Sequence, residues 1–355
     1  MAIKLKKAMT VGLICFFCVM MPATTFSWSQ ASHAYIADRL GARAGYDNLD
    51  ELWGIVAPDF FNFIFDLALC PGWVSDQTHG TYTDTFLKVW NVADTNAEQA
   101  LAYGFVGHNQ QWGADNPAHV SCLTCGQDDG YIIVKAKLLL NAPVDPDNPG
   151  QTFGDAFAGL GMNPDMALLV AHGITEDAID IRLGNEADPL LGRKLATAAR
   201  NETKRFQPLL VKAFAADYAA YCFGGDYATA ASVLTAAEKG HRKDMIFLGQ
   251  AISQSEPVAV QLLAEQLAGV ISELGFAVPV ETVKAAISSS MTICADYKAE
   301  IDATIGFVGK NLEDHKITYD PKSGGKTGSG ESLTKVGPVM SEMLYDRVLK
   351  FSPRR

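Results

Sequence analysis

Helical periodicity over residues 185–310 is the feature that most constrains how this chain folds. This region is rich in alanine and leucine, and its apolar residues recur at the spacing of one helix face. Strand signals are scarce, and there is no convincing internal repeat. We therefore predict an all-α protein. The predicted helices in this region are Asp188–Ala198, Phe206–Tyr221, Tyr227–Glu238, Met245–Ala251, Pro257–Leu274, Val280–Met291 and Ala295–Phe307.

The first 27 residues have the pattern of a secretory signal peptide. Three lysines precede an apolar run over Met9–Met21, and small residues suit a cleavage site after Ser27. The mature protein is therefore expected to be secreted or periplasmic. No later segment has about 18 consecutive apolar residues, so no transmembrane segment is expected after signal removal.

The predicted mature chain is acidic, with 26 basic and 40 acidic residues and a net charge of −14. This charge argues against a strong nucleic-acid-binding surface and against non-specific binding to anionic lipid. It does not exclude a small metal site, because bound dications would set the field there.

Five cysteines follow the predicted signal peptide: Cys70, Cys122, Cys125, Cys222 and Cys294. In an oxidising compartment they predict one or two disulfides with one thiol left over. The Cys122-x-x-Cys125 spacing suits half of a zinc ribbon, but the second such pair is missing. A disulfide or two inert thiols is the preferred interpretation.

The stretch from residue 103 to residue 120 carries the first candidate metal ligands. A helix is predicted from residue 97 to about residue 119, and on it His108, Asp115 and His119 lie within about 20° of one face. Two imidazoles and a carboxylate on one face suit a divalent metal, zinc above all. The alternative is an ordinary helix with two hydrogen-bonded histidines.

Other histidines and acids also have two interpretations. His172 and Glu176 are one turn apart on a predicted helix, so they can share a metal ion or a hydrogen bond. Asp59 follows a proline, where it can cap a helix or serve as a ligand or base. His79 is expected in a polar loop over residues 71–85, where a histidine is ordinarily only solvated.

The predicted mature N-terminus supplies two more candidates. Cleavage would leave Trp28 as the first residue, and its free amine and carbonyl would form a chelate. His33 lies five residues later, on a helix expected to end at Gly41. The alternative is an ordinary chain end with a surface histidine.

In their order along the chain, these residues resemble the metal ligands of the zinc-dependent phospholipase C family and of the related S1/P1 nucleases. The shared pattern is an N-terminal Trp, a nearby His, an Asp, a loop His, an H…D…H helix and an H-x-x-x-E/D helix. The matching residues are Trp28, His33, Asp59, His79, His108, Asp115, His119, His172 and Glu176.

The resemblance implies a multi-helix fold like that of phospholipase C and P1 nuclease, with three zinc ions in a cleft. The implied sets are Asp59, His79 and His108 for the first ion, Trp28 and His33 for another, and His119, His172 and Glu176 for the third. Asp115 is the candidate for the carboxylate that bridges two ions. The family places this aspartate one turn after the first histidine of the central helix, where this chain has Trp112. Either the helix bulges or bends around Gly113–Pro117 to bring Asp115 into place, or the bridging site is altered.

The implied function is that of a secreted zinc-dependent phosphodiester hydrolase, like phospholipase C. A metal-activated water would attack a phospholipid or another phosphodiester, and Asp59 would accept its proton. The alternatives are a single-strand nuclease of the S1/P1 type and a non-catalytic, zinc-bearing helical binding protein. The acidic charge and Glu176 disfavour the nuclease. Neither the head group nor the oligomeric state is predicted.

The expected organisation has four parts: a signal peptide (1–27), a zinc-binding catalytic helical core (28–185), a helical extension (186–318) and a Gly/Ser-rich flexible linker with a tail (319–355).

Overall fold

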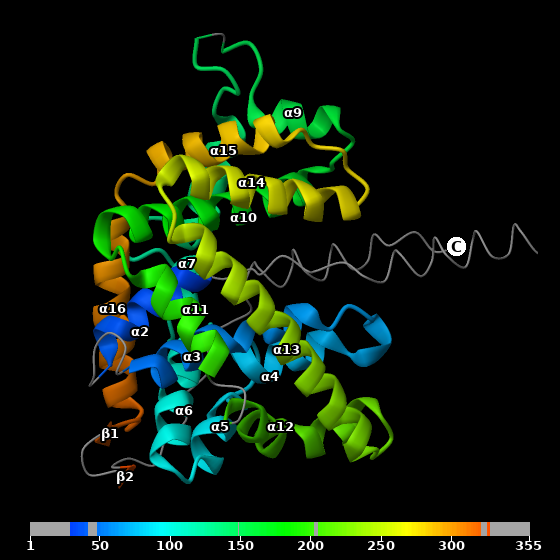
Figure 1. Cartoon of the computed structure of the whole chain (residues 1–355), viewed down its shortest axis with the longest axis vertical. Helices are drawn as coiled ribbons and strands as arrows, with labels where there is room; N and C mark the ends of the chain where they lie inside the picture. The colour runs from blue at the N-terminus through cyan, green and yellow to red at the C-terminus, as the bar shows by residue number, and fades with distance from the viewer. Residues whose placement is uncertain (1–28, 42–47, 148, 202–204, 321–324, 327–355) are drawn as a thin grey trace, which may run out of the picture.

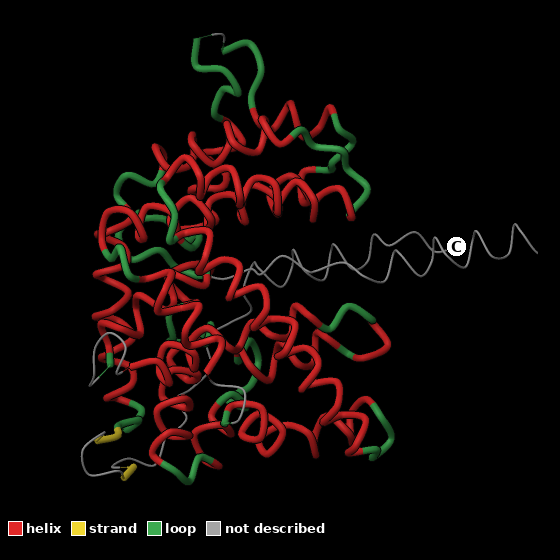
Figure 2. Tube along the Cα trace, in the orientation of Figure 1, coloured by secondary structure: helices red, strands yellow, loops and turns green. Residues whose placement is uncertain are grey.

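The computed structural model describes residues 29–41, 48–147, 149–201, 205–320 and 325–326. Within them the predicted all-α class is confirmed, because helices make up most of the described chain (Figure 2). The described strands are β1 (Tyr319–Asp320) and β2 (Gly325–Lys326), which pair antiparallel. The predicted signal peptide, Trp28 and most of the predicted tail lie outside the described residues.

The first half of the chain supplies short helices that meet near the candidate ligands. They are α2 (Gln30–Leu40), α3 (Leu49–Val56), the 3-10 helices η2 (Ala57–Phe63) and η3 (Leu67–Leu69), α4 (Pro71–His79), α5 (Leu87–Val92), α6 (Asn96–His108) and α7 (Asp115–His119).

The helices from residue 131 onwards are mostly longer. They are α8 (Tyr131–Asn141), α9 (Phe153–Gly159), α10 (Pro164–Arg182) with the π turn η4 (Leu183–Ala187), α11 (Leu191–Asn201), α12 (Phe206–Cys222), α13 (Tyr227–Ile252), α14 (Glu256–Glu273), α15 (Val280–Ile293) and α16 (Tyr297–Asp314). Figure 1 shows α14 and α15 side by side against α10, with α13 running down towards α12.

Helices on both sides of residue 185 pack on one another. α11 contacts α2 and α3, and α13 contacts η2. Lys194 on α11 binds the carboxylates of Asp38 (2.7 Å) and Asp188 (2.6 Å), which ties α11 to α2. One cluster of buried apolar side chains includes residues from both parts. The division at residue 185 stays a prediction about the organisation of the chain.

The predicted break between Tyr227–Glu238 and Met245–Ala251 is wrong, because α13 is one helix of 26 residues. Its interior Gly240 lies against the ring of Phe63, where a Cβ atom would be 2.8 Å from the ring. Glycine is a poor helix former, and here it is needed for close packing rather than for a break.

The predicted loop at His79 is also wrong. Residues 71–79 form α4, which begins with Pro71 at its first position and ends before Gly80, a residue in the left-handed conformation (φ 70°). Proline at the start and glycine after the end are ordinary boundaries of a helix. His79 is therefore the last residue of a rigid helix, and its side chain is buried.

Two disulfides and one free thiol agree with the prediction from the cysteine count. Cys70 pairs with Cys222, Cys122 pairs with Cys125, and Cys294 is buried and free. The first bridge joins the start of α4 to the end of α12. Among the described helices, none has the length and apolarity that a membrane crossing requires.

Candidate metal centre

The central helix is interrupted, contrary to the prediction of one helix from residue 97 to residue 119. α6 ends at His108, and α7 begins at Asp115. The side-chain oxygen of Asn109 accepts hydrogen bonds from the backbone N–H groups of Gln111 and Trp112, both at 2.9 Å. A Cβ atom on Gly113 would lie 2.5 Å from the backbone nitrogen of Asn109, so this tight turn needs glycine.

The turn brings Asp115 back to the end of α6. Its Oδ2 lies 3.8 Å from His108 Nε2, and its Oδ1 lies 3.8 Å from His33 Nε2 and 3.5 Å from His119 Nδ1. One carboxylate therefore faces three imidazoles from α2, α6 and α7. The three ligand candidates predicted on one helix face do meet, but through a turn.

Trp112, one turn after His108 in the sequence, lies outside this cluster. Its indole stacks on His315 with ring centroids 4.3 Å apart and meets Phe86 edge-on at 5.4 Å. Its backbone carbonyl accepts a hydrogen bond from Asn311. Trp112 thus packs α16 against the turn. Asp115, and not residue 112, is the residue that lies among the three histidines.

Asp59, His79 and His108 form one potential metal triad. His79 Nε2 lies 3.2 Å from Asp59 Oδ1 and 3.0 Å from His108 Nε2. His108 Nδ1 donates to the carbonyl of Ile55 at 2.8 Å, which leaves its Nε2 as the nitrogen that faces the triad. Asp59 lies within η2 and caps no helix there.

His119, His172 and Glu176 form a second triad. His172 Nε2 lies 2.8 Å from Glu176 Oε1 and 3.2 Å from His119 Nε2, and His119 Nε2 lies 3.8 Å from the same Glu176 oxygen. Both members from α10 are 3% exposed, and His119 is 1% exposed.

His33, His108 and Asp115 form a third potential triad, which shares His108 with the first. The rings of His33 and His108 are stacked, with centroids 4.3 Å apart. All eight described candidates are thus brought together, whereas Trp28 lies outside the described residues.

The spacing in the triads fits zinc. Ligand atoms about 2.0–2.2 Å from one tetrahedral ion lie about 3.3–3.6 Å apart. The separations given above range from 2.8 to 3.8 Å, and the ligand atoms of each triad all lie within 4.8 Å of one another. Both carboxylate oxygens of Asp115 and Nδ1 of His119 are buried without a hydrogen-bond partner among the described residues. The three imidazoles face this buried carboxylate only at 3.5–3.8 Å, and a cation among them would stabilise it further.

The electrostatics favour the metal-binding protonation state at four of the candidate ligands. At His79 and His119 neighbouring carboxylates raise the pKa against the effect of burial, and burial raises the pKa of Glu176, so these three favour their protonated forms without a bound cation. Burial lowers the pKa of His108 and of His172 to about 3, so both imidazoles are neutral at pH 7. Burial alone would raise the pKa of Asp115, but His108 and His119 outweigh it and lower the pKa to about 2. Asp59 is likewise kept ionised, because His108 and His79 outweigh burial and lower its pKa.

Three supporting residues were not identified from the sequence. Gln30 donates its amide N–H to Asp59 Oδ2 at 2.7 Å. The hydroxyl of Thr78 is 2.8 Å from His79 Nδ1. Asp180 accepts hydrogen bonds from the backbone N–H groups at the start of α2, with Ala31 at 2.9 Å, and from the hydroxyl of Ser32 at 2.8 Å. Of these three residues, only Asp180 could have been suspected from the local sequence, because it is one helical turn after Glu176.

Asp180 fixes the helix that carries His33. Burial raises the pKa of Asp180 to about 6, although its hydrogen bonds to Ser29 and Ser32 oppose this shift. The carboxylate joins α10 to the first turn of α2, and so it sets the position of His33 relative to the α10 ligands.

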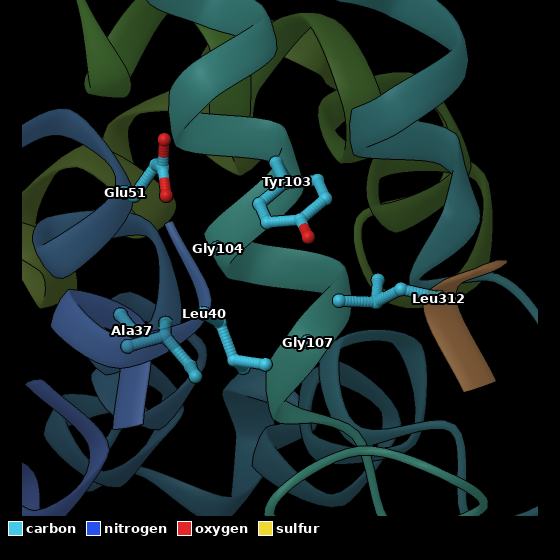
Figure 3. Close-up of a pocket in the computed structure, with 8 residues that line it drawn as sticks. Ala37, Leu40, Glu51, Tyr103, Gly104, Gly107 and Leu312 are labelled. Atoms are coloured by element: carbon cyan, nitrogen blue, oxygen red, sulfur yellow. The ribbon is translucent and has the colours of Figure 1, made fainter. Parts of the chain in front are cut away.

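A small cavity of about 10 Å³ lies between α3 and α6, with Glu51 and Tyr103 in its wall (Figure 3). Burial raises the pKa of Tyr103 to about 12, and the charge of Glu51 adds to this shift. The candidate ligands do not line this cavity, which has room for about one water molecule.

Comparisons with known proteins add no relative. No protein-family model, no curated protein and no solved structure matches the chain.

Proposed function

We propose that this protein is an exported, zinc-dependent phosphodiester hydrolase that acts on phospholipids in the manner of phospholipase C. The observation that carries the proposal is the position of Asp115, whose two oxygens face histidines of three helices between two further His/Asp/Glu triads. A carboxylate in such a position suits a bridge between ions, and adjacent ions suit phosphodiester hydrolysis.

Zinc bound at these triads would supply a water of lowered pKa and positive charge for the phosphoryl oxygens. Side chains of the protein would orient the zinc ligands and accept the proton of the water. Gln30 donates a hydrogen bond to Oδ2 of Asp59, and His79 lies beside Oδ1 of the same carboxylate. The lowered pKa of Asp59 keeps its carboxylate ionised at neutral pH, which suits a metal ligand but makes it a weak base. We assign it the role of proton acceptor from its position in the first triad.

The histidine orientations support the same assignment. His108 Nδ1 is occupied by the Ile55 carbonyl, and His79 Nδ1 lies beside the Thr78 hydroxyl, so that both rings direct Nε2 to Asp59. Hydrogen bonds of this kind orient metal-binding histidines and set their tautomer.

A structural zinc site in a binding protein is the second candidate. The near-complete burial of all eight ligands favours it, since structural zinc sites are closed whereas catalytic sites keep an open position. The nuclease alternative has less support, because the acidic chain opposes binding to a polyanion.

Metal analysis combined with substrate assays tests these proposals. The mature chain, purified in the presence of zinc, is expected to hold about three zinc ions, one for each triad. It would then be incubated with a choline phospholipid, single-stranded DNA and a simple phosphodiester. We expect turnover of the phospholipid and the simple diester.

Each other outcome has a defined meaning. Turnover of DNA alone would favour the nuclease. A fully zinc-loaded protein without turnover of any substrate would refute both enzyme proposals and leave the structural site. A protein without zinc after this purification would refute the metal centre itself.

A further inference from the structure

An exposed aromatic patch lies at the end of α4 opposite to His79. It consists of Leu67, Trp73 and Tyr221, of which Leu67 is 53% exposed, Tyr221 is 65% exposed and Trp73 is half-buried. Large apolar side chains gathered at one place on a surface mark an interaction site more often than single ones do.

The patch is rigid. Trp73 stacks on Tyr221 with ring centroids 5.5 Å apart and on the buried Tyr218 at 5.2 Å. The Cys70–Cys222 disulfide joins the two segments that carry these rings. The hydroxyl of Tyr218 donates to the backbone carbonyl of Leu69, which fixes the turn that exposes Leu67. Binding through such a surface requires little ordering of side chains.

The charge around the patch indicates which kind of lipid surface the patch fits. The sequence has no lysine or arginine in residues 44–87 or 213–238, the two segments that form the patch, and Lys88 next to them is paired with Asp217 on α12. Asp66 and Asp226, which are exposed, lie in these segments instead. Anionic lipid would be repelled, whereas a choline head group is attracted both to carboxylates and to aromatic faces.

We propose that the aromatic patch docks the protein on the surface of a zwitterionic phospholipid bilayer. Tryptophan and tyrosine rings favour the interfacial region of a bilayer, and an exposed leucine can enter its apolar part. This inference rests on the proposed function, because it names the surface on which the hydrolase meets its substrate.

The position of the patch suits that role. Trp73 is in the first turn of α4, and His79 is the last residue of the same helix. Six residues of α-helix span about 9 Å, so docking through the patch would bring the metal centre close to the head groups. α4 and the end of α12 lie on the same side of the molecule in Figure 1.

Binding of the mature protein to phosphatidylcholine vesicles tests the proposal. Sedimentation would measure the bound fraction, and brominated phosphatidylcholine would quench a tryptophan that enters the bilayer. Trp53, Trp90 and Trp112 are buried, so Trp73 is the half-exposed tryptophan among the described residues. We expect binding and quenching with the wild-type protein, and loss of the quenching in Trp73→Phe.

Two leucine variants provide a matched comparison. Leu67→Ser should weaken binding about tenfold, as expected when one leucine no longer leaves water. Leu138→Ser on α8, where the leucine is 50% exposed, should bind as the wild type does. Replacing part of the phosphatidylcholine by anionic lipid should not strengthen binding.

Absence of binding by the wild type, or equal loss in both leucine variants, would overturn the proposal. So would a dimer that Leu67→Ser dissociates, since the patch would then bind a second copy. Hydrolysis of a short-chain phosphatidylcholine below its micelle concentration separates the two proposals. Its absence counts against the proposed function, whereas vesicle binding alone decides the docking surface.

Discussion

Asp115 is the residue on which the candidate metal centre depends most, because it alone faces His33, His108 and His119 together. Asp115→Asn keeps the size of the side chain but removes its charge and one of its two acceptor oxygens. Even residues that only support metal ligands commonly contribute 10–100-fold to affinity or activity, so we expect at least about a 100-fold loss of activity. Zinc content should fall by at least one ion per chain.

The control for this variant is Asp145→Asn, at an exposed turn far along the chain from the ligands. It should retain full zinc and activity. Thermal unfolding with and without added zinc checks that Asp115→Asn still folds. Full zinc content and activity in a folded Asp115→Asn protein would contradict the assignment of Asp115.

His241, which is not one of the candidate ligands, predicts a pH dependence of stability. Its Nε2–H donates to the carbonyl of Val56, and burial lowers its pKa from 6.5 to about 4. The unfolded chain therefore binds more protons in this range, and stability is lost as the pH falls from 6.5 to 4, by about 3 kcal/mol. Urea unfolding between pH 7 and pH 4 should show a smaller loss for His241→Gln, which can still donate to Val56. Equal losses in both proteins would refute this role.

The candidate ligands that the structure brings together could be identified from the sequence, because their types and order are themselves the signal. Their supporting contacts could not. Gln30 and Asp59, or Ser32 and Asp180, are far apart along the chain, and no local spacing indicates that their side chains meet. A residue that acts through a long-range hydrogen bond becomes visible only once the helices are placed.

At the scale of the elements, the crossing of α3 and α6 positions His108. A Cβ atom on Gly104 would lie 2.2 Å from the carbonyl oxygen of Glu51, so the two backbones pack in direct contact. Gly104→Ala should lower the stability by about 1–3 kcal/mol through overpacking. It should also weaken zinc binding, because His108 is held by the carbonyl of Ile55 on the opposing helix.

Gly107→Ala on the same helix is the matched control. A Cβ atom there would meet its nearest neighbours at 3.7 and 3.8 Å, which is ordinary contact. Alanine is favoured over glycine in a helix by about 1 kcal/mol, so this variant should be as stable as the wild type or more stable. Urea unfolding and zinc titration compare the two. Equal effects of both variants would argue against the close crossing.

Helix periodicity predicted the long helices α12, α14 and α15 within a few residues, because each buries one apolar face. Periodicity did not predict the helix boundaries that depend on tertiary contacts. The break after His108 involves the side chain of Asn109 and close packing at Gly113, in the region where a bend was one of the expected alternatives. The continuity of α13 through Gly240 is the opposite of what the glycine suggests locally.

At the scale of the whole molecule, helices after residue 185 are more than an addition to the part that carries the candidate metal ligands. α11 and α13 cover α3 and η2, which carry or support the first triad, and α15 packs on α10, which carries the second. Periodicity identified these helices but contains no information about which face meets which partner. Their contacts support the position of Asp59 and His172 from outside the ligand set.

The two disulfides should therefore differ strongly in their effect on global stability. Cys70–Cys222 spans 152 residues and joins the N-terminal helices to α12, whereas Cys122–Cys125 spans three. In the chain-entropy model the long bridge contributes about 5 kcal/mol and the short one less than about 2 kcal/mol. Replacing each pair by serines and measuring urea unfolding with a chelator present, so that zinc does not contribute, compares the two directly.

The long-bridge variant should be destabilised by several kcal/mol more, and its vesicle binding should also fall because the aromatic patch loses its link. Similar unfolding midpoints for the two variants would mean that α12 is held by its packing alone.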